Sequence, residues 1–250
     1  MAGTTLPGRL TWTLASVRES ILETPGARTL VLDVPGWRGH RPGQHVDIRL
    51  TAEDGYQAER SYSIASAPDS ERIELTVERL DDGEVSLYLT GELRAGDQLE
   101  LRGPIGGYFT WTIADGGPLM LVGGGSGIVP LMAMLRHRAS GSSTISTRLL
   151  GSFRAFDAIL YREEIERLAG ADPALDVTWT LTRAQPPEWS GLSRRVDAAM
   201  LTESGWPPDL RPLVYVCGPT PFVETVAATL VGLGHEPSRV RTERFGPTGG

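Results

Sequence analysis

The feature of this 250-residue chain that most constrains its fold is a change of hydrophobic rhythm at Asp115-Gly116-Gly117-Pro118. Before this segment, short runs such as residues 45–50 largely alternate apolar and polar side chains, as half-buried strands do. After it, apolar runs such as residues 119–122 alternate with amphipathic stretches of helical length. The two patterns belong to different kinds of sheet, so we predict two domains of different class.

The first domain, residues 10–114, is predicted to be an antiparallel β-barrel or a sandwich. Its clearest strands are residues 29–34, 45–50 and 72–77. Turn signals at Pro35-Gly36 and Asp82-Gly83 support many short strands with tight connections.

The second domain, residues 117–250, is predicted to be a doubly wound α/β fold with a parallel sheet. Its expected strands are residues 119–122, 146–150, 177–181, 213–216 and 240–244. Its expected helices are residues 129–138, 157–168 and 222–233, the last closed by Gly234. The alternating charges of residues 162–167 are interpreted as a solvated helix face rather than a docking site.

Composition narrows the classes of protein. A formal net charge of -7 argues against a nucleic-acid partner, which would require clustered Lys and Arg. The single cysteine, Cys217, allows no internal disulfide and no iron–sulfur cluster. The four histidines show no ligand pattern, so no metal site is expected, and each is interpreted as a surface or packing residue: His40, His45, His137 and His235. The start of the chain lacks the features of a signal peptide and no long apolar segment follows, so a cytoplasmic protein without a membrane partner is expected.

A glycine-rich turn, Gly123-Gly124-Gly125-Ser126-Gly127, follows an expected strand and opens an expected helix. Such a turn presents backbone N–H groups to a phosphate, and the helix N-terminus adds partial positive charge. Ile128 occupies the position where the dinucleotide fingerprint needs its last glycine, and no lysine follows to complete a Walker loop. A sharp strand-to-helix connection without a ligand therefore stays open as an alternative.

A second motif, Arg60-Ser61-Tyr62-Ser63, suits a flat aromatic ligand with a charged tail. Arginine grips a phosphate with two donors, tyrosine stacks on a ring, and serine hydroxyls bond ring heteroatoms. A strand with an exposed arginine and a packed tyrosine would have the same sequence.

Together the two halves resemble the ferredoxin–NADP reductase family of flavoprotein reductases, in its stand-alone ferredoxin reductase type. Four segments occur in the family's order from the first half to the second: Arg41-Pro42-Gly43-Gln44, Arg60-Ser61-Tyr62-Ser63, the run from Gly123 to Pro130, and Cys217-Gly218-Pro219. The resemblance covers residues 10–246 and implies a flavin-binding barrel followed by an NAD(P)-binding domain.

In the first domain, the resemblance implies that Arg60 holds a flavin phosphate, Tyr62 lies along the isoalloxazine ring, and Ser63 bonds near flavin N5. Gly83, Val85 and Ser86 match a second phosphate-binding turn, which favours FAD over FMN.

In the second domain, the resemblance assigns the dinucleotide turn to Gly123, Gly124, Gly125 and Gly127, and the segment beside the nicotinamide to Cys217, Gly218 and Pro219. A buried packing role for Cys217 is the alternative. The tail Glu243-Arg244-Phe245-Gly246 resembles the family's C-terminal segment, where an acidic residue and an aromatic approach the flavin. As a hypothesis, Phe245 covers the flavin until nicotinamide displaces it.

The choice of donor is expected to depend on Thr182 and Arg183, which match the family's site for the adenosine ribose. No carboxylate occupies position 182, and Arg183 with Arg154 would pair with a 2′-phosphate, so NADPH is preferred over NADH.

The function implied is hydride transfer from NAD(P)H to FAD by stacked rings, with Tyr62, Ser63, Cys217 and Phe245 at the reacting centre. Electrons would then leave for a separate acceptor protein, a ferredoxin or an oxygenase component. Two alternatives remain: a reductase of free flavin or small quinones, and a flavin-binding regulatory subunit.

Overall fold

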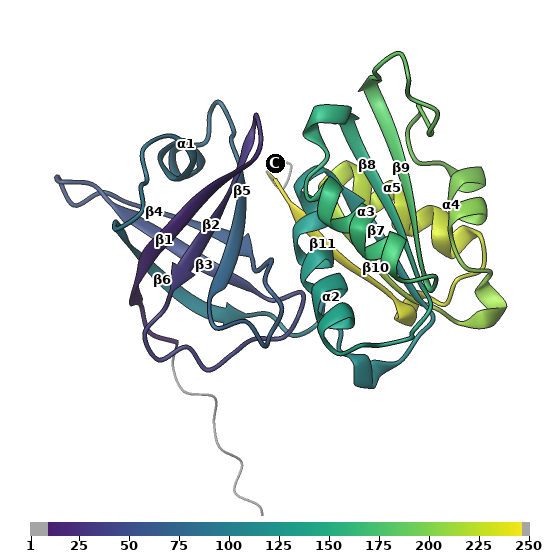
Figure 1. The fold of residues 1–250 in the computed structure, drawn as a ribbon, viewed down its shortest axis with the longest axis horizontal. Helices are drawn as coiled ribbons and strands as arrows, with labels where there is room; N and C mark the ends of the chain where they lie inside the picture. The colour runs from purple at the N-terminus through teal and green to yellow at the C-terminus, as the bar shows by residue number, and fades with distance from the viewer. Residues whose placement is uncertain (1–9, 247–250) are drawn as a thin grey trace, which may run out of the picture.

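A computed structural model describes residues 10–246, and it contains two sheets that lie side by side (Figure 1). The first sheet is antiparallel, with six strands in the order β4-β3-β6-β1-β2-β5. These strands are β1 (Thr13–Thr24), β2 (Ala27–Asp33), β3 (His45–Thr51), β4 (Gln57–Ser63), β5 (Ile73–Glu78) and β6 (Gln98–Ile105). A bridge between Ile64 and Leu75 brings the two edges of the sheet together, which makes it barrel-like as expected.

Alternation explains the packing of this first sheet. Val46 and Ile48 on β3 are fully buried, whereas Asp47 between them and Arg49 directly after them are half-buried. Helix α1 (Glu84–Gly91) covers one end of the barrel and buries Val85 and Leu89. The sequence pattern did not predict this helix, because it is short and begins in a segment interpreted as a turn.

The second sheet is parallel, with five strands in the order β11-β10-β7-β8-β9. Its strands are β7 (Leu119–Gly124), β8 (Thr147–Ala155), β9 (Leu175–Ala184), β10 (Leu213–Pro219) and β11 (Val240–Phe245). Its helices are α2 (Ile128–Ser140), α3 (Arg162–Ala171), α4 (Ala198–Ser204) and α5 (Thr220–Gly232). The chain runs outward from β7 through β8 to β9 and then returns to add β10 and β11 on the other side, which is the doubly wound order predicted.

Helices cover both faces of this sheet, so all six residues of β7 are buried. Leu119 and Leu121 pack on the side of α2 and α3, whereas Met120 and Val122 pack on the side of α4 and α5. Among residues 10–246, no helix is long and apolar enough to cross a membrane. Residues 247–250 of the predicted second domain, like the first nine residues, lie outside the described part.

The helix expected over residues 157–168 begins later than predicted, at Arg162. Residues 156–158 form a 3-10 turn, and Tyr161 has a left-handed backbone with φ of 55°. The backbone N–H of Tyr161 donates to the Glu23 carboxylate of the barrel at 2.9 Å. This contact with the other domain stabilises a backbone conformation that a helix would not allow.

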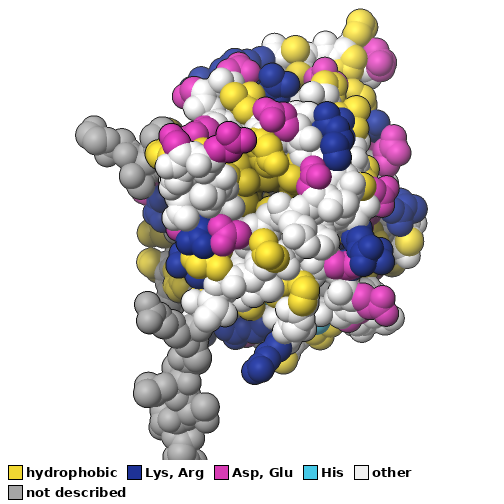
Figure 2. Space-filling view, turned by 90° about the vertical axis from the view of Figure 1, so that its left-hand side faces the viewer, with side chains coloured by type: hydrophobic (Ala, Val, Ile, Leu, Met, Phe, Trp, Pro, Cys, Tyr) yellow, Lys and Arg dark blue, Asp and Glu magenta, His cyan; other side chains and the backbone are white. Residues whose placement is uncertain are grey.

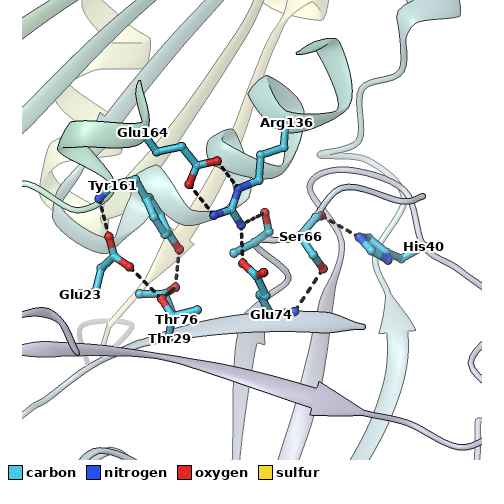
Figure 3. A network of polar contacts seen from close by, with 10 residues as sticks. Glu23, Thr29, His40, Ser66, Glu74, Thr76, Arg136, Tyr161 and Glu164 are labelled. Carbon is cyan, nitrogen blue, oxygen red and sulfur yellow. Dashed lines mark hydrogen bonds and ion pairs between the residues drawn. The ribbon is translucent and has the colours of Figure 1, made fainter. Parts of the chain in front are cut away.

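A polar network joins the two domains on one side (Figure 3). Arg136 of α2 donates to Glu74 of β5 at 2.6 Å, to Glu164 of α3 at 2.7 Å and to the Ala65 carbonyl at 3.0 Å. Tyr161 adds a hydroxyl contact to Thr76 of β5. Glu164 therefore lies at the domain interface, and the interpretation of residues 162–167 as a wholly solvated face was wrong at this position.

Candidate functional site

The candidate site lies where the carboxyl ends of β7, β10 and β11 meet the barrel. Strand register places Cys217 of β10 between Gly123 of β7 and Glu243 of β11. In the barrel, register places His45 of β3 opposite Ser63 at the end of β4. His45 Nδ1 lies 3.8 Å from Glu243 Oε1. This contact connects the barrel residues with the residues at the ends of the parallel strands.

The glycine-rich turn packs closely on the end of β10. A Cβ at Gly127 would overlap the Cys217 carbonyl and lie 2.7 Å from the Gly218 nitrogen. Gly125 has φ of +53°, and Gly124 lies against the Phe222 ring of α5. The structure therefore brings together the two motifs that the sequence separates by about ninety residues: Gly123, Gly124, Gly125 and Gly127 with Cys217, Gly218 and Pro219.

Arg41-Pro42-Gly43-Gln44 shapes the barrel side of the junction. Gly43 has φ of +92°, and a Cβ there would overlap the Phe109 carbonyl and reach Met134 of α2. The Gln44 amide donates to the Gly106 carbonyl at 2.7 Å, and its oxygen accepts from the Arg41 N–H at 2.7 Å. This segment positions the start of β3, and hence His45.

The Arg60 motif leaves donors free at the surface. Arg60 is exposed, and its hydrogen bond within the described chain goes to the Glu59 carbonyl next to it. Tyr62 packs against the barrel core, where burial raises the pKa of its phenol to about 12. Ser63 is half-buried at the end of β4. A neutral ring beside a free guanidinium matches a flat ligand with an anionic tail.

The turn at Gly83 offers backbone rather than side-chain donors. The Ser86 hydroxyl donates to the Gly83 carbonyl at 2.9 Å and accepts from the Leu80 N–H at 3.1 Å, and the Val85 side chain is buried. Only the N–H groups at the start of α1 are therefore available to a phosphate, and Glu84 stands beside them.

Thr182 and Arg183 lie at the carboxyl end of β9, apart from the Cys217 region. The Thr182 hydroxyl donates to the Phe153 carbonyl at 3.2 Å. Arg183 and Arg154 are both exposed, on neighbouring strands.

The alternative role for Cys217, a buried packing residue, agrees with its exposed fraction of 1%. Burial raises the pKa of the thiol, and the nearby Glu243 raises it further.

Phe245 pairs with Pro219 in the sheet and packs against the core cluster that includes Ile128 and Cys217. The hydroxyl of Thr220, directly after Pro219, is buried without a hydrogen-bond partner in the described residues. Seen from the barrel side, the surface has a recessed apolar area with charged side chains around it (Figure 2).

The structure adds His45 to the residues around the candidate site, whereas the sequence interpretation assigned it to the surface or to packing. Its register opposite Ser63 and its contact with Glu243 are visible only in the folded structure. Histidine and acidic residues form no metal-binding group of three or more within residues 10–246.

Comparisons with known proteins agree with this architecture. Residues 17–110 match the model of the oxidoreductase FAD-binding domain, and residues 121–228 match that of the oxidoreductase NAD-binding domain. The fold and these two matches define a flavoprotein oxidoreductase, and the expectation of FAD rather than FMN is confirmed. The chain belongs to the ferredoxin–NADP reductase family.

Three relatives illustrate the likeness. Ferredoxin–NADP reductase B of Sorangium cellulosum (strain So ce56) is 35% identical over 209 residues, which are 81% of this chain and 84% of that protein. The glycine betaine monooxygenase reductase subunit of Pseudomonas aeruginosa (strain UCBPP-PA14) is 32% identical over 232 residues, 91% of this chain but 63% of that protein. A solved ferredoxin NADP+ reductase from Neisseria gonorrhoeae, with bound FAD and NADP, has a TM-score of 0.79 at 20% identity and covers 93% of this chain and 98% of that one. The chain thus spans about three-fifths of some of the curated relatives that it matches.

Proposed function

We propose that this chain takes a hydride from NAD(P)H onto a bound FAD and passes electrons to an acceptor protein outside these 250 residues. Residues 10–114 would form the domain that binds the flavin, and residues 117–250 would form the domain that binds NAD(P)H. The proposal rests on one observation: the contact between His45 and Glu243 brings the end of the Arg60 motif strand next to the end of β10.

The described residues fit an FAD. Arg60 has free donors for one phosphate, and the first turn of α1 after Gly83 has free N–H groups for another. Tyr62 and Ser63 would lie along the ring. When bound, FAD supplies a ring system that accepts a hydride and releases electrons singly.

The nicotinamide dinucleotide would bind along the carboxyl ends of the parallel strands, as ligands do in doubly wound folds. Gly123, Gly124, Gly125 and Gly127 would approach its pyrophosphate, and Cys217, Gly218 and Pro219 would line the nicotinamide. Cys217 stays a neutral thiol because its pKa is raised, so it positions the ring and carries no charge. Phe245 would leave the ring when nicotinamide stacks.

The acceptor is proposed to be a ferredoxin or an oxygenase component. Support comes from the names of the relatives, which include ferredoxin–NADP reductase and monooxygenase reductase subunits. Cys217 is the single cysteine of the sequence, so these residues hold no cysteine-ligated cluster of their own.

The test begins with an absorbance spectrum of the protein loaded with FAD, followed by anaerobic titration with NADPH and NADH. Bleaching of the flavin by either donor supports the proposal, and a protein that binds no added flavin overturns it. Arg60→Ala should weaken flavin binding, whereas Arg72→Ala, which removes an exposed arginine paired with Asp33, should not.

The acceptor is tested with ferredoxins, free flavin and a small quinone. Faster reduction of a ferredoxin supports a protein acceptor, and equal or faster reduction of free flavin supports the small-molecule reductase. Bound flavin that both donors reduce poorly would indicate the regulatory subunit.

A further inference from the structure

The pair His45 and Glu243 links the two domains at the candidate site. The side chains come from β3 and β11, are 24% and 26% exposed, and have their nearest nitrogen and oxygen 3.8 Å apart. His45 lies opposite Ser63, and Glu243 lies opposite Cys217. Any charge on either side chain is therefore next to the residues assigned to the two rings.

The two groups lie in surroundings that oppose their usual charge. Glu243 Oε2 is buried and has no hydrogen-bond partner in the described chain, and burial raises the pKa of this carboxyl to about 7. Burial lowers the pKa of His45, and Gly106, with φ of +97°, lies against its imidazole ring. Burial thus favours the neutral form of both groups.

The charged neighbours on the same two strands are Asp47 and Arg244, and the charge of Asp47 opposes burial by raising the pKa of His45. Asp47, the carboxylate nearest to His45 on β3, is bound by Arg102 at 2.6 Å and by Ser61 at 2.7 Å. On β11, Arg244 is bound to Glu224 of α5 at 2.6 Å.

The remaining neighbours are the guanidinium of Arg241 and the thiol of Cys217. Arg241 of β11 donates to the Thr110 carbonyl at 2.7 Å. From β10 the group facing Glu243 is the neutral thiol of Cys217. Within residues 10–246, His45 is the basic group paired with Glu243, and the contact is an ion pair when the imidazole is protonated.

We propose that His45 is a positioning residue that sets the protonation of Glu243, and through it the charge beside the stacked rings. The inference rests on the proposed function. An imidazolium 3.8 Å away favours the carboxylate, and the carboxylate favours the imidazolium by the same free energy. An isolated carboxylate would place a full negative charge where hydride, also carrying negative charge, has to arrive.

The test measures the coupling directly, without activity. The Glu243 carboxyl is titrated by infrared difference spectroscopy in the flavin-free protein, and its band is identified by its loss in Glu243→Gln. His45→Gln should move the Glu243 midpoint to higher pH by about half a unit or more, a change of about threefold in proton affinity. Conversely, Glu243→Gln should lower the His45 midpoint measured by NMR. His137→Gln is the control, because His137 is another half-buried histidine but packs on Trp111.

The kinetic test follows anaerobic flavin reduction against pH in stopped flow. In His45→Gln the pH at which the rate changes should move upward with the infrared midpoint, and in His137→Gln it should stay. Superimposable titrations in wild type and His45→Gln would overturn the inference even if hydride transfer is normal. Failure of NAD(P)H to reduce the flavin would instead overturn the proposed function and leave the titration result standing.

Discussion

Arg136 on α2 and Glu74 on β5 form an ion pair of 2.6 Å that crosses from the NAD-binding domain to the barrel (Figure 3). The same guanidinium is bonded to Glu164 of α3 and to the Ala65 carbonyl. Burial disfavours the charge of Arg136, but its bonds to Glu164 and the charge of Glu74 raise its pKa, so it stays protonated. The proposed hydride transfer would require two rings, each held by a different domain, to stack closely, and this network fixes the domains relative to each other.

Arg136→Met should lower the free energy of unfolding by about 1 to 3 kcal/mol, because Glu74 and Glu164 lose their partner in a partly buried position. Urea denaturation followed by circular dichroism measures this change. The control is Arg162→Met, which breaks an exposed pair with Glu166 and should cost about 0.5 kcal/mol or less. Equal losses in the two variants would show that the network adds nothing beyond a surface pair.

The sequence predicted the fold class because each half has its own hydrophobic period. Strand β3 and helix α5 follow that period closely, and their expected bounds differ from the observed ones by a few residues at most. The start of α3 could not be predicted, because Tyr161 takes its left-handed backbone through a contact with Glu23, which lies 138 residues earlier. The place of Glu164 at the domain interface could not be predicted for the same reason, since its partner Arg136 lies on another helix.

Gly127→Ala should abolish tight nicotinamide binding and lower the free energy of unfolding by about 2 kcal/mol or more. The added Cβ would overlap the Cys217 carbonyl and lie too close to the Gly218 nitrogen. Both are backbone atoms of β10, which cannot move aside. Thermal denaturation and NADPH titration measure the two effects. Gly232→Ala is the matched control: nothing lies within 4 Å of its Cβ position at the end of α5, so it should stabilise the protein slightly. A Gly127→Ala protein as stable as wild type, with unchanged cofactor binding, would contradict this account.

Glu243→Gln should stabilise the flavin-free protein at alkaline pH only. The folded-state pKa of about 7 lies above the ordinary value of 4.5, so the folded state retains a proton that the unfolded state loses between these values. The free energy of unfolding of wild type therefore falls as pH rises from 4.5 to about 7 and then levels off. The variant lacks this penalty, so the two proteins should match near pH 4.5, and the variant should be more stable at pH 8 by about 1 to 3 kcal/mol.

Urea denaturation at a series of pH values measures the Glu243→Gln effect. Glu163→Gln removes a carboxylate that is 90% exposed and should show no such dependence on pH. A constant difference between wild type and Glu243→Gln across the range would show that the carboxyl is not destabilised by its burial.

The candidate site was predictable in its motifs but not in its contacts. Gly127 and Cys217 each stood in a recognisable segment, whereas no local pattern marks His45 as a partner of Glu243. That contact exists because β3 and β11 belong to different domains whose ends meet, so it depends on how the domains pack. The sequence also did not indicate which hydrogen bonds the side chains form. The Ser86 hydroxyl, for example, donates to the Gly83 carbonyl within its own turn.

The proposed preference for NADPH over NADH depends mainly on one exposed residue, Arg183. Arg183 is exposed at the end of β9, and the described chain gives it no ion pair, while the Thr182 hydroxyl is engaged with the Phe153 carbonyl. If Arg183 binds the 2′-phosphate, Arg183→Ala should lower kcat/KM for NADPH by about tenfold or more and change the value for NADH by less than about twofold. Arg167→Ala, an exposed arginine on α3, should leave both values unchanged. Equal loss with both donors would refute the phosphate role, because NADH lacks the phosphate and a shared loss would have to come from binding common to the two.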